Sequence, residues 1–186
     1  MNDTQKQTLL KVAHDTVEAV IKRKPTITIL SDDPELNAHC GCFVTLKNHG
    51  RLRGCIGNFI SDSPLIELVA EMAKASATSD PRFFADRISA RELNQLDIEI
   101  SVLSPLQRTT EPLNLQLGVD GIYIKKGHAS GCFLPQVATE TGWNKEEFLS
   151  YCCSHKAGLA PDAWKDPNTE VYLFIADVFG ADFKDI

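Results

Sequence analysis

Residues 46–57 read Leu-Lys-Asn-His-Gly-Arg-Leu-Arg-Gly-Cys-Ile-Gly, and this stretch predicts the second half of a β-hairpin. Leu52 and Ile56 alternate with Arg53 and Cys55, which is the two-residue period of a half-buried strand. Cys55 is therefore expected on the polar face of the strand, beside arginine, and not on the apolar face.

The register of this hairpin follows from the need to keep one face apolar. A three-residue loop over 48–50, with Gly50 left-handed, pairs Phe43 with Cys55 and Thr45 with Arg53. The other face then holds only apolar residues and glycine, as register selection requires. We therefore predict the three-residue loop, because a two-residue loop mixes the faces.

Cys55 is the first candidate for chemistry, as a reactive thiol. Gly54 and Gly57 lie close to it, and small neighbours leave the sulfur and nearby amides open to a ligand. A neighbouring Arg53 favours the thiolate, which is the reactive form, and could itself hold an anionic ligand. The alternative is that Cys55 packs as a small hydrophobic residue, as free cysteines often do.

The rest of the chain predicts helices and strands that do not alternate strictly, which indicates the α+β class with a mixed or antiparallel sheet. We expect one compact domain over 1–186 with two lobes, the larger around the 41–57 hairpin and the smaller closing over it. Ser63 is the expected cap of the second helix, with Pro64 as its first residue. The expected helices cover 4–22, 64–78, a short helix opened by the capping box at 89–92, and 144–154. The expected strands cover 97–104, 121–125, 131–134 and 170–179, and residues 105–117 are expected to be irregular.

Composition limits the classes of function. The chain has 186 residues, 43% of them hydrophobic, and a formal net charge of −6. This acidic balance gives duplex nucleic acid no general attraction. No run approaches the roughly 20 apolar residues that cross a bilayer, and the first residues lack a signal-peptide core, so we expect a cytoplasmic protein without a membrane association.

The six cysteines do not indicate a metal site. Cys40 and Cys42 form a Cys-x-Cys pair, and Cys152 and Cys153 are adjacent. A cytosolic setting keeps thiols reduced, and neither spacing is usual for zinc. We therefore predict no bound metal and no cofactor.

Four more residues are candidates for ligand binding, each with a structural alternative. Asp80 and Arg82 either help to bind an anionic ligand or form a turn with its own ion pair. Gln136 either offers its amide to a ligand or stabilises a loop. Lys156 either offers a cation to an acidic ligand or lies at a helix end, capped by left-handed Gly158.

The run Leu52-Arg53-Gly54-Cys55-Ile56-Gly57 resembles the signature of the AMMECR family. In bacteria and archaea this family appears as protein A of the AmmeMemoRadiSam system. The family usually continues the Asp-Pro-Arg-Phe block with prolines, whereas Phe84 and Ala85 stand there in this chain. Further matching blocks, in the family's order, are Thr78-Ser79-Asp80-Pro81-Arg82-Phe83, Ile98-Glu99-Ile100-Ser101-Val102-Leu103, Leu134-Pro135-Gln136-Val137, Gly142-Trp143 and Lys156-Ala157-Gly158-Leu159.

The resemblance implies an AMMECR-like fold and a ligand- or substrate-binding subunit that works with Memo-like and radical-SAM partners. The substrate would be a small molecule or a peptide, and the matching Asp-Pro-Arg-Phe block adds Phe83 to the candidate ligand-binding residues. The chain lacks Cys-x-x-x-Cys-x-x-Cys, so it is not itself the radical-SAM partner. One alternative is a cysteine-dependent enzyme with Cys55 as the reactive thiol in a cleft. A further alternative is an RNA-associated regulatory protein, against which the acidic charge counts.

Overall fold

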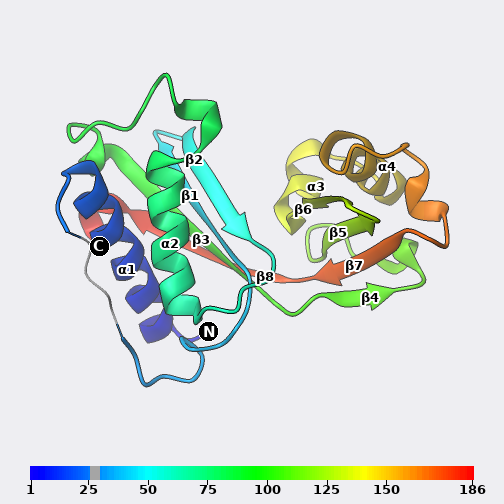
Figure 1. The fold of residues 1–186 in the computed structure, drawn as a ribbon, viewed down its shortest axis with the longest axis horizontal. Coiled ribbons are helices and arrows are strands. Elements are labelled where there is room, and N and C mark those ends of the chain that lie inside the picture. The colour runs from blue at the N-terminus through cyan, green and yellow to red at the C-terminus, as the bar shows by residue number, and fades with distance from the viewer. Residues whose placement is uncertain (26–29) are drawn as a thin grey trace. The chain divides into compact units, whose positions relative to one another are not determined.

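The computed structural model describes residues 1–25 and 30–186, and these form two compact units (Figure 1). The first unit consists of 1–103 and 177–186, and the second of 104–176. Each unit contains one four-stranded sheet with helices packed on it, which confirms the predicted α+β class. Over these described residues, none of the helices combines the length and apolarity that a bilayer crossing requires.

In the first unit, helices α1 and α2 lie side by side against the sheet (Figure 1). The strand order of this sheet is β2-β1-β3-β8, and β1 pairs antiparallel with both β2 and β3. Both helices are found where helical periodicity predicts them. The elements are α1 (Asp3–Ile21), β1 (Cys42–Asn48), β2 (Arg51–Asn58), α2 (Leu65–Thr78), β3 (Leu96–Leu103) and β8 (Ala176–Asp182), with short 3-10 turns at Pro81–Phe83, Leu93–Gln95 and Phe183–Asp185.

The start of α2 differs from the prediction, because Ser63 does not cap it. Pro64 is the N-cap residue, and no side chain of the described residues caps the helix. Instead the Leu65 N–H donates to the Ala38 carbonyl at 3.0 Å, and the Ile66 N–H donates to the Leu36 carbonyl at 2.9 Å. A loop distant in sequence therefore supplies the acceptors that the first turn of a helix needs.

The predicted register of the hairpin is wrong. The loop has two residues, His49 and Gly50, both with positive φ (49° and 77°). Asn48 pairs with Arg51, and the register then shifts so that Thr45 pairs with Cys55. The shift is a β-bulge, and the extra residue on β2 is Arg53. The bulge keeps the apolar residues of both strands on one face of the hairpin. The three-residue loop was predicted to have this effect.

In the second unit, the strand order is β4-β7-β5-β6. The hairpin of β5 and β6 and the helix α4 are found where they are predicted, and Asn144 forms a capping box with Glu147. Residues 105–117 are less irregular than predicted, because β4 pairs with β7, and α3 is an element that the sequence analysis missed. The elements are β4 (Gln107–Thr109), β5 (Gly121–Lys126), β6 (Ala129–Phe133), α3 (Pro135–Thr141), α4 (Lys145–Tyr151) and β7 (Glu170–Phe174), with a π-helical turn at Cys152–Lys156 and 3-10 turns at Pro112–Asn114 and Ala163–Lys165.

The single strand predicted over 170–179 is wrong, because the chain leaves one sheet at Ile175 and enters the other. Ser104 holds this break: its N–H donates to the Ile175 carbonyl at 2.9 Å, and its Oγ accepts from the Ile175 N–H at 3.0 Å. Ile175 and Val178 are 54% and 43% exposed, so their apolar side chains are not core residues.

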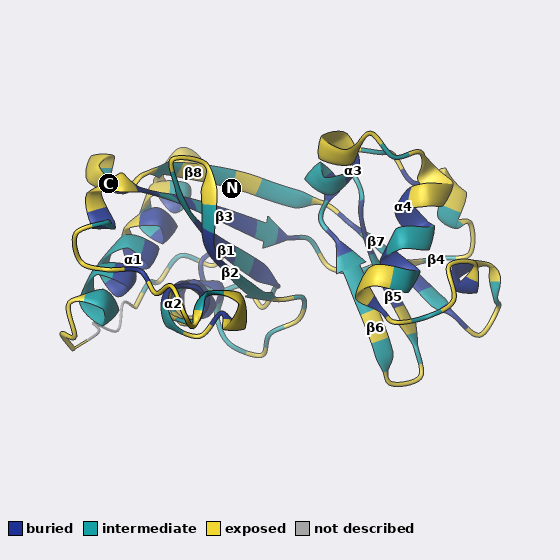
Figure 2. Ribbon diagram, turned by 90° about the horizontal axis from the view of Figure 1, so that it is seen from above, coloured by how far each residue is buried: buried dark blue, intermediate teal, exposed yellow. Residues whose placement is uncertain are grey.

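Each unit has its own apolar core, which Figure 2 shows as dark blue segments. The core of the first unit joins the inner faces of α1 and α2 to Val44 and Leu46 of β1. The core of the second unit joins Phe148 and Cys152 to the β5 side chains Ile122 and Ile124. The two cores lie between each sheet and the helices packed on it.

Candidate functional site

Cys55 lies on the face of β2 opposite α2, as the alternation predicts. Its cross-strand partner Thr45 lies on the same face, and the Thr45 hydroxyl donates a hydrogen bond to the Cys55 sulfur at 3.3 Å. Cys55 is half-buried, whereas Cys42 on the opposite face is fully buried. Cys55 is thus a partly exposed thiol with a fixed hydrogen-bond donor beside it.

Asp80 and Arg82 cover the outer edge of β2 at Cys55. The Cys55 N–H donates to Asp80 Oδ2 at 2.9 Å, and its carbonyl accepts from Arg82 Nη2 at 3.1 Å. These two bonds satisfy backbone groups of β2, which in the described part of the chain is an edge strand of its sheet. The 3-10 turn that contains Arg82 is therefore fastened to the cysteine by both a carboxylate and a guanidinium.

The Asp80 carboxylate also holds Arg82 directly. Oδ1 accepts from the Arg82 backbone N–H at 3.1 Å and from Nε at 2.9 Å, while Oδ2 accepts from Nη2 at 2.6 Å. These hydrogen bonds from Arg82, with the one from Cys55, lower the pKa of Asp80 to about 2 despite its burial. Asp80 is therefore ionised at all ordinary pH values.

Arg82 is fixed and yet exposed. Its side chain is 53% exposed, whereas that of Asp80 is 2% exposed. The guanidinium carbon also lies 5.6 Å from the ring centroid of half-buried Phe83. A ligand approaching from solvent meets the Arg82 guanidinium, because the buried Asp80 carboxylate lies behind the guanidinium.

Arg53 is placed differently from the expectation. At the bulge its side chain is only 3% exposed; Nη1 donates to Asp86 Oδ2 at 2.8 Å, and Nε lies 3.2 Å from Glu92 Oε2. The Nε contact is an ion pair without hydrogen-bond geometry. Arg51 shares Asp86 with it, at 3.1 Å. Arg53 is thus the buried centre of a charge network and not an exposed cation beside the thiol.

The two glycines allow close packing and do not open the site. A Cβ on Gly54 would collide with the Ser76 carbonyl of α2, and one on Gly57 would collide with the ring of Phe43. The Ser76 hydroxyl enters the hairpin itself, donating to the Val44 carbonyl at 2.7 Å and accepting from the Ile56 N–H at 2.9 Å. Close packing of β2 on α2 therefore requires Gly54, and close packing of β2 on the Phe43 ring of β1 requires Gly57, which gives a structural reason for both glycines.

Gln136 and Lys156 belong to the second unit, whereas the other candidates belong to the first. Gln136 lies in the first turn of α3, and its carbonyl accepts from the Thr139 hydroxyl at 2.8 Å. Lys156 ends the π-helical turn and lies 5.7 Å from the ring centroid of Phe133. Gly158 is left-handed with φ of 66°, as its alternative role as a helix end requires.

Among the residues that the structure describes, no imidazole is hydrogen-bonded to the Cys55 sulfur. Over the same residues no group of three or more His, Cys, Asp or Glu side chains is arranged to hold a metal. Four members of this site are not predicted by the sequence pattern: Thr45, Ser76, Asp86 and Glu92. The correct hairpin register would have revealed Thr45, whereas the other three come from segments whose approach the local pattern does not encode.

The fold and this site define an α+β protein with a helix-covered sheet in each of two units and an anchored arginine beside a half-buried cysteine. The chain belongs to the AMMECR1 family, whose model matches residues 10–179. A protein from Methanothermobacter thermautotrophicus is 41% identical over 187 residues, covering 95% of this chain and 94% of that one. A protein from Thermococcus kodakarensis is 40% identical over 186 residues, covering 94% of this chain and 89% of that one.

The fold matches a solved structure over its whole length. The crystal structure of an uncharacterized protein from Pyrococcus horikoshii is similar with a TM-score of 0.89 and 37% sequence identity. The match covers 100% of this chain and 95% of that chain. The arrangement of elements described above is therefore shared with that relative.

Proposed function

We propose that this chain is a cytoplasmic ligand-binding subunit, protein A of an AmmeMemoRadiSam system, that works with Memo-like and radical-SAM partners. Membership of the AMMECR1 family supports the assignment of this chain to that system and to those partners. The ion pair of Asp80 and Arg82 beside Cys55 supports ligand binding. The part of the ligand that Arg82 contacts is an anionic group of a small molecule or a peptide.

One observation carries this proposal: Arg82 is fixed before any ligand arrives. The Asp80 carboxylate accepts two hydrogen bonds from the Arg82 guanidinium and one from the Arg82 backbone N–H, yet the Arg82 side chain is still 53% exposed. An arginine that is already ordered loses little conformational entropy when it binds a carboxylate or phosphate. Because the pair has no net charge, recognition rests on directed N–H groups and not on general attraction.

The binding proposal is tested by native mass spectrometry of the purified chain, produced alone and together with its Memo-like and radical-SAM partners. We expect a retained small molecule or peptide, or capture of a partner, that is lost in Arg82→Gln. The matched control is Arg87→Gln, because Arg87 is also exposed and lies 5.6 Å from the ring centroid of Phe84, but within residues 1–25 and 30–186 it forms no ion pair with an aspartate. Equal retention by the Arg82 and Arg87 variants would contradict the proposal.

The second candidate function is a cysteine-dependent enzyme with Cys55 as its thiol. The specific observation in its favour is the hydrogen bond from Thr45 to the sulfur, because a donor to sulfur stabilises the thiolate. The absence of a bonded imidazole among the described residues leaves the activating base unaccounted for, and for that reason binding is the first proposal.

Alkylation rates separate the two functions. If the thiol is tuned for reaction, Thr45→Val should slow iodoacetamide labelling of Cys55 severalfold, whereas Thr45→Ser should retain the wild-type rate. Cys55→Ser should then abolish turnover of any ligand found above. If Cys55→Ser and wild type retain and release that ligand alike, the enzyme hypothesis fails and the binding proposal stands.

A further inference from the structure

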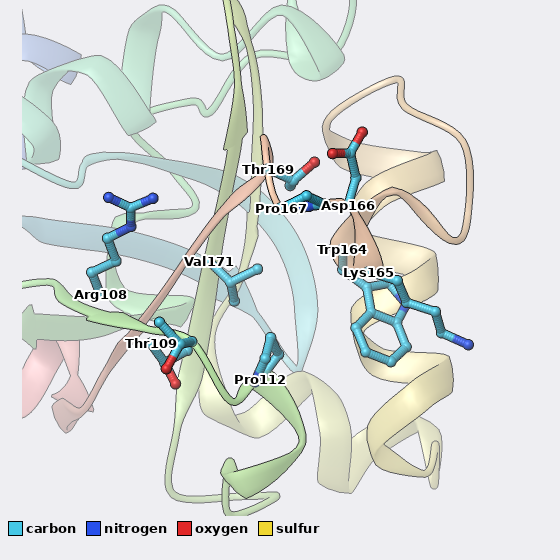
Figure 3. A pocket seen from close by; sticks show the side chains of 10 residues that line it. Arg108, Thr109, Pro112, Trp164, Lys165, Asp166, Pro167, Thr169 and Val171 are labelled. Carbon is cyan, nitrogen blue, oxygen red and sulfur yellow. The ribbon is translucent and has the colours of Figure 1, made fainter.

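The second unit contains a pocket of about 360 Å³ beside β4 and β7 (Figure 3). Its apolar wall is nearly covered, because Val171 and Trp164 are 2% and 7% exposed and Lys165 Nζ lies 4.8 Å from the indole ring centroid. Arg108 pairs with Tyr172 and not with Val171, so its side chain lies on the opposite face of the sheet. One ligand cannot meet both the cation and the apolar wall, and the pocket therefore indicates no class of ligand.

The β-bulge of the first unit gives Arg53 an unusual position. Leu46 pairs with Gly54 and Lys47 pairs with Leu52, which leaves Arg53 as the extra residue of β2. Bulges re-aim a side chain and are common beside functional sites. The guanidinium of Arg53 consequently leaves the face of Cys55 and meets the segment 80–92, which contains Arg82.

Three carboxylates attach the segment 80–92 to the hairpin. Asp80 Oδ2 accepts from the Cys55 N–H at 2.9 Å, and Asp86 Oδ2 accepts from Arg53 Nη1 at 2.8 Å. Glu92 Oε2 lies 3.2 Å from Arg53 Nε. Arg82 lies between the first and the second attachment, so its turn is fastened on both sides, and Arg53 supplies the attachments that follow it.

The link between Asp86 and the turn of Arg82 is short and hydrogen-bonded. The Phe83 N–H donates to the Asp80 carbonyl at 3.1 Å, and the Asp86 N–H donates to the Phe83 carbonyl at 3.1 Å. These two bonds close successive turns, so a displacement of Asp86 also displaces the backbone that carries Arg82. Exposed segments with few anchors open locally at little cost in free energy, and Asp86 is an anchor of this segment.

Burial of the Arg53 charge is not explained by stability alone. Its side chain is 3% exposed, and its Nε has no hydrogen-bond partner among the described residues. Apolar residues of similar volume often replace a buried ion pair without loss of stability. The side chains of Asp86 and Glu92 are 57% and 25% exposed, so both carboxylates can return to water if Arg53 is removed. An arginine here is better explained by the segment that it holds.

We infer that Arg53 is a positioning residue, which fixes the exposed guanidinium of Arg82 for ligand binding by holding Asp86. Its part in binding rests on the proposed function, whereas the order of Arg82 can be measured in the free chain. The bulge in β2 is then the feature that brings a buried guanidinium to the segment beside Cys55.

Nuclear magnetic resonance of the ¹⁵N-labelled full chain measures the order of Arg82 through solvent exchange of its Nε–Hε group, assigned from its loss in Arg82→Gln. This group donates to Asp80 Oδ1 at 2.9 Å. We expect Arg53→Met, which keeps an apolar stem, to raise the exchange rate about fivefold or more, because the turn opens more often. Asp86→Asn should raise the rate similarly, since it weakens the same contact from the other side.

Arg51→Met is the matched control. Arg51 also contacts Asp86 Oδ2, at 3.1 Å, but its side chain is 73% exposed, and exposed ion pairs contribute little. This variant should leave the Arg82 exchange rate within about twofold of wild type. The backbone N–H of Leu10, in the core of the first unit, should likewise keep its rate within about twofold in every variant, which separates lost position from lost stability.

The combined variant Arg53→Met with Asp86→Asn tests whether Arg53 acts through Asp86. Its Arg82 exchange rate should equal that of Asp86→Asn, because two residues that share one contact do not have additive effects. Effects of the two substitutions that multiply would mean that Arg53 acts by another route, against the inference.

Native mass spectrometry connects position to binding. Arg53→Met should lose whatever molecule or partner Arg82→Gln loses, whereas Arg51→Met should retain it. If Arg82→Gln loses nothing, the proposed function fails, and the exchange rates still decide the role of Arg53. The inference is overturned by an unchanged Arg82 exchange rate in Arg53→Met, by an equal rise at Leu10 or in Arg51→Met, or by full retention in Arg53→Met of a molecule that Arg82→Gln loses.

Discussion

Replacing Asp80 by asparagine should weaken the first unit by an amount that depends on pH. The carboxylate is 2% exposed and accepts hydrogen bonds from Cys55 and Arg82. Its pKa falls from 3.8 to about 2. Since one pH unit of pKa change corresponds to about 1.4 kcal/mol, the ionised form contributes about 2 kcal/mol to the free energy of unfolding at pH 7.

The sign follows from the lowered pKa. A carboxyl group that is a stronger acid in the folded state stabilises the fold fully above its unfolded pKa of 3.8, and this contribution is lost as the pH falls toward 2. Asp80→Asn should therefore lower the free energy of unfolding by about 2 to 3 kcal/mol at pH 7. The difference from wild type should shrink by about 1 kcal/mol at pH 3.

Urea unfolding at the two pH values measures both quantities, with Asp62→Asn as the control. Asp62 is an exposed aspartate of the same unit, and its replacement should change stability by no more than about 0.5 kcal/mol. A variant at Asp80 that equals wild type at pH 7 would refute the argument. So would a loss of stability that is the same at pH 7 and pH 3, because that result would mean that the charge of Asp80 does not contribute.

Three further outcomes follow from packing in the first unit and from thiol burial. Ser76→Ala removes the hydroxyl that joins the two hairpin strands and should cost about 1–3 kcal/mol in a urea melt, because a buried carbonyl and N–H lose their partner. Gly54→Ala should cost about 3 kcal/mol or more by the same measurement, since its Cβ would collide with the backbone of α2. Burial raises the pKa of the Cys42 and Cys152 thiols, so iodoacetamide should leave both unlabelled at pH 8 in the native protein and label them only in urea, with Cys55 labelled before either.

The elements of this fold follow largely from local sequence. Helical spacing of apolar residues places α1 and α2, and the capping box at Asn144 places the start of α4. The alternation that predicts β2 also predicts that Cys55 lies on the face away from α2. These features depend on contacts between residues close in the chain, where period and capping chemistry are sufficient.

The surroundings of the candidate site depend on tertiary structure. Alternation predicts that Arg53 shares the open face of Cys55, whereas the bulge buries it against Asp86 and Glu92, which approach from a distant loop. Likewise, a continuous apolar pattern predicts one strand over 170–179, whereas Ser104 breaks it by bonding Ile175. In both places a partner far along the chain decides the outcome.

By itself, therefore, the sequence determined the class of fold, the helices other than α3, most strands, and the candidate thiol with its arginine turn. Only the tertiary structure showed that Asp80 anchors Arg82 to the backbone of Cys55, and that the lining of a pocket includes Thr169 and Arg108. The physical reason is that secondary structure reflects local periodicity. Burial, ion pairing and cavities instead arise from side chains that folding brings together from separate segments.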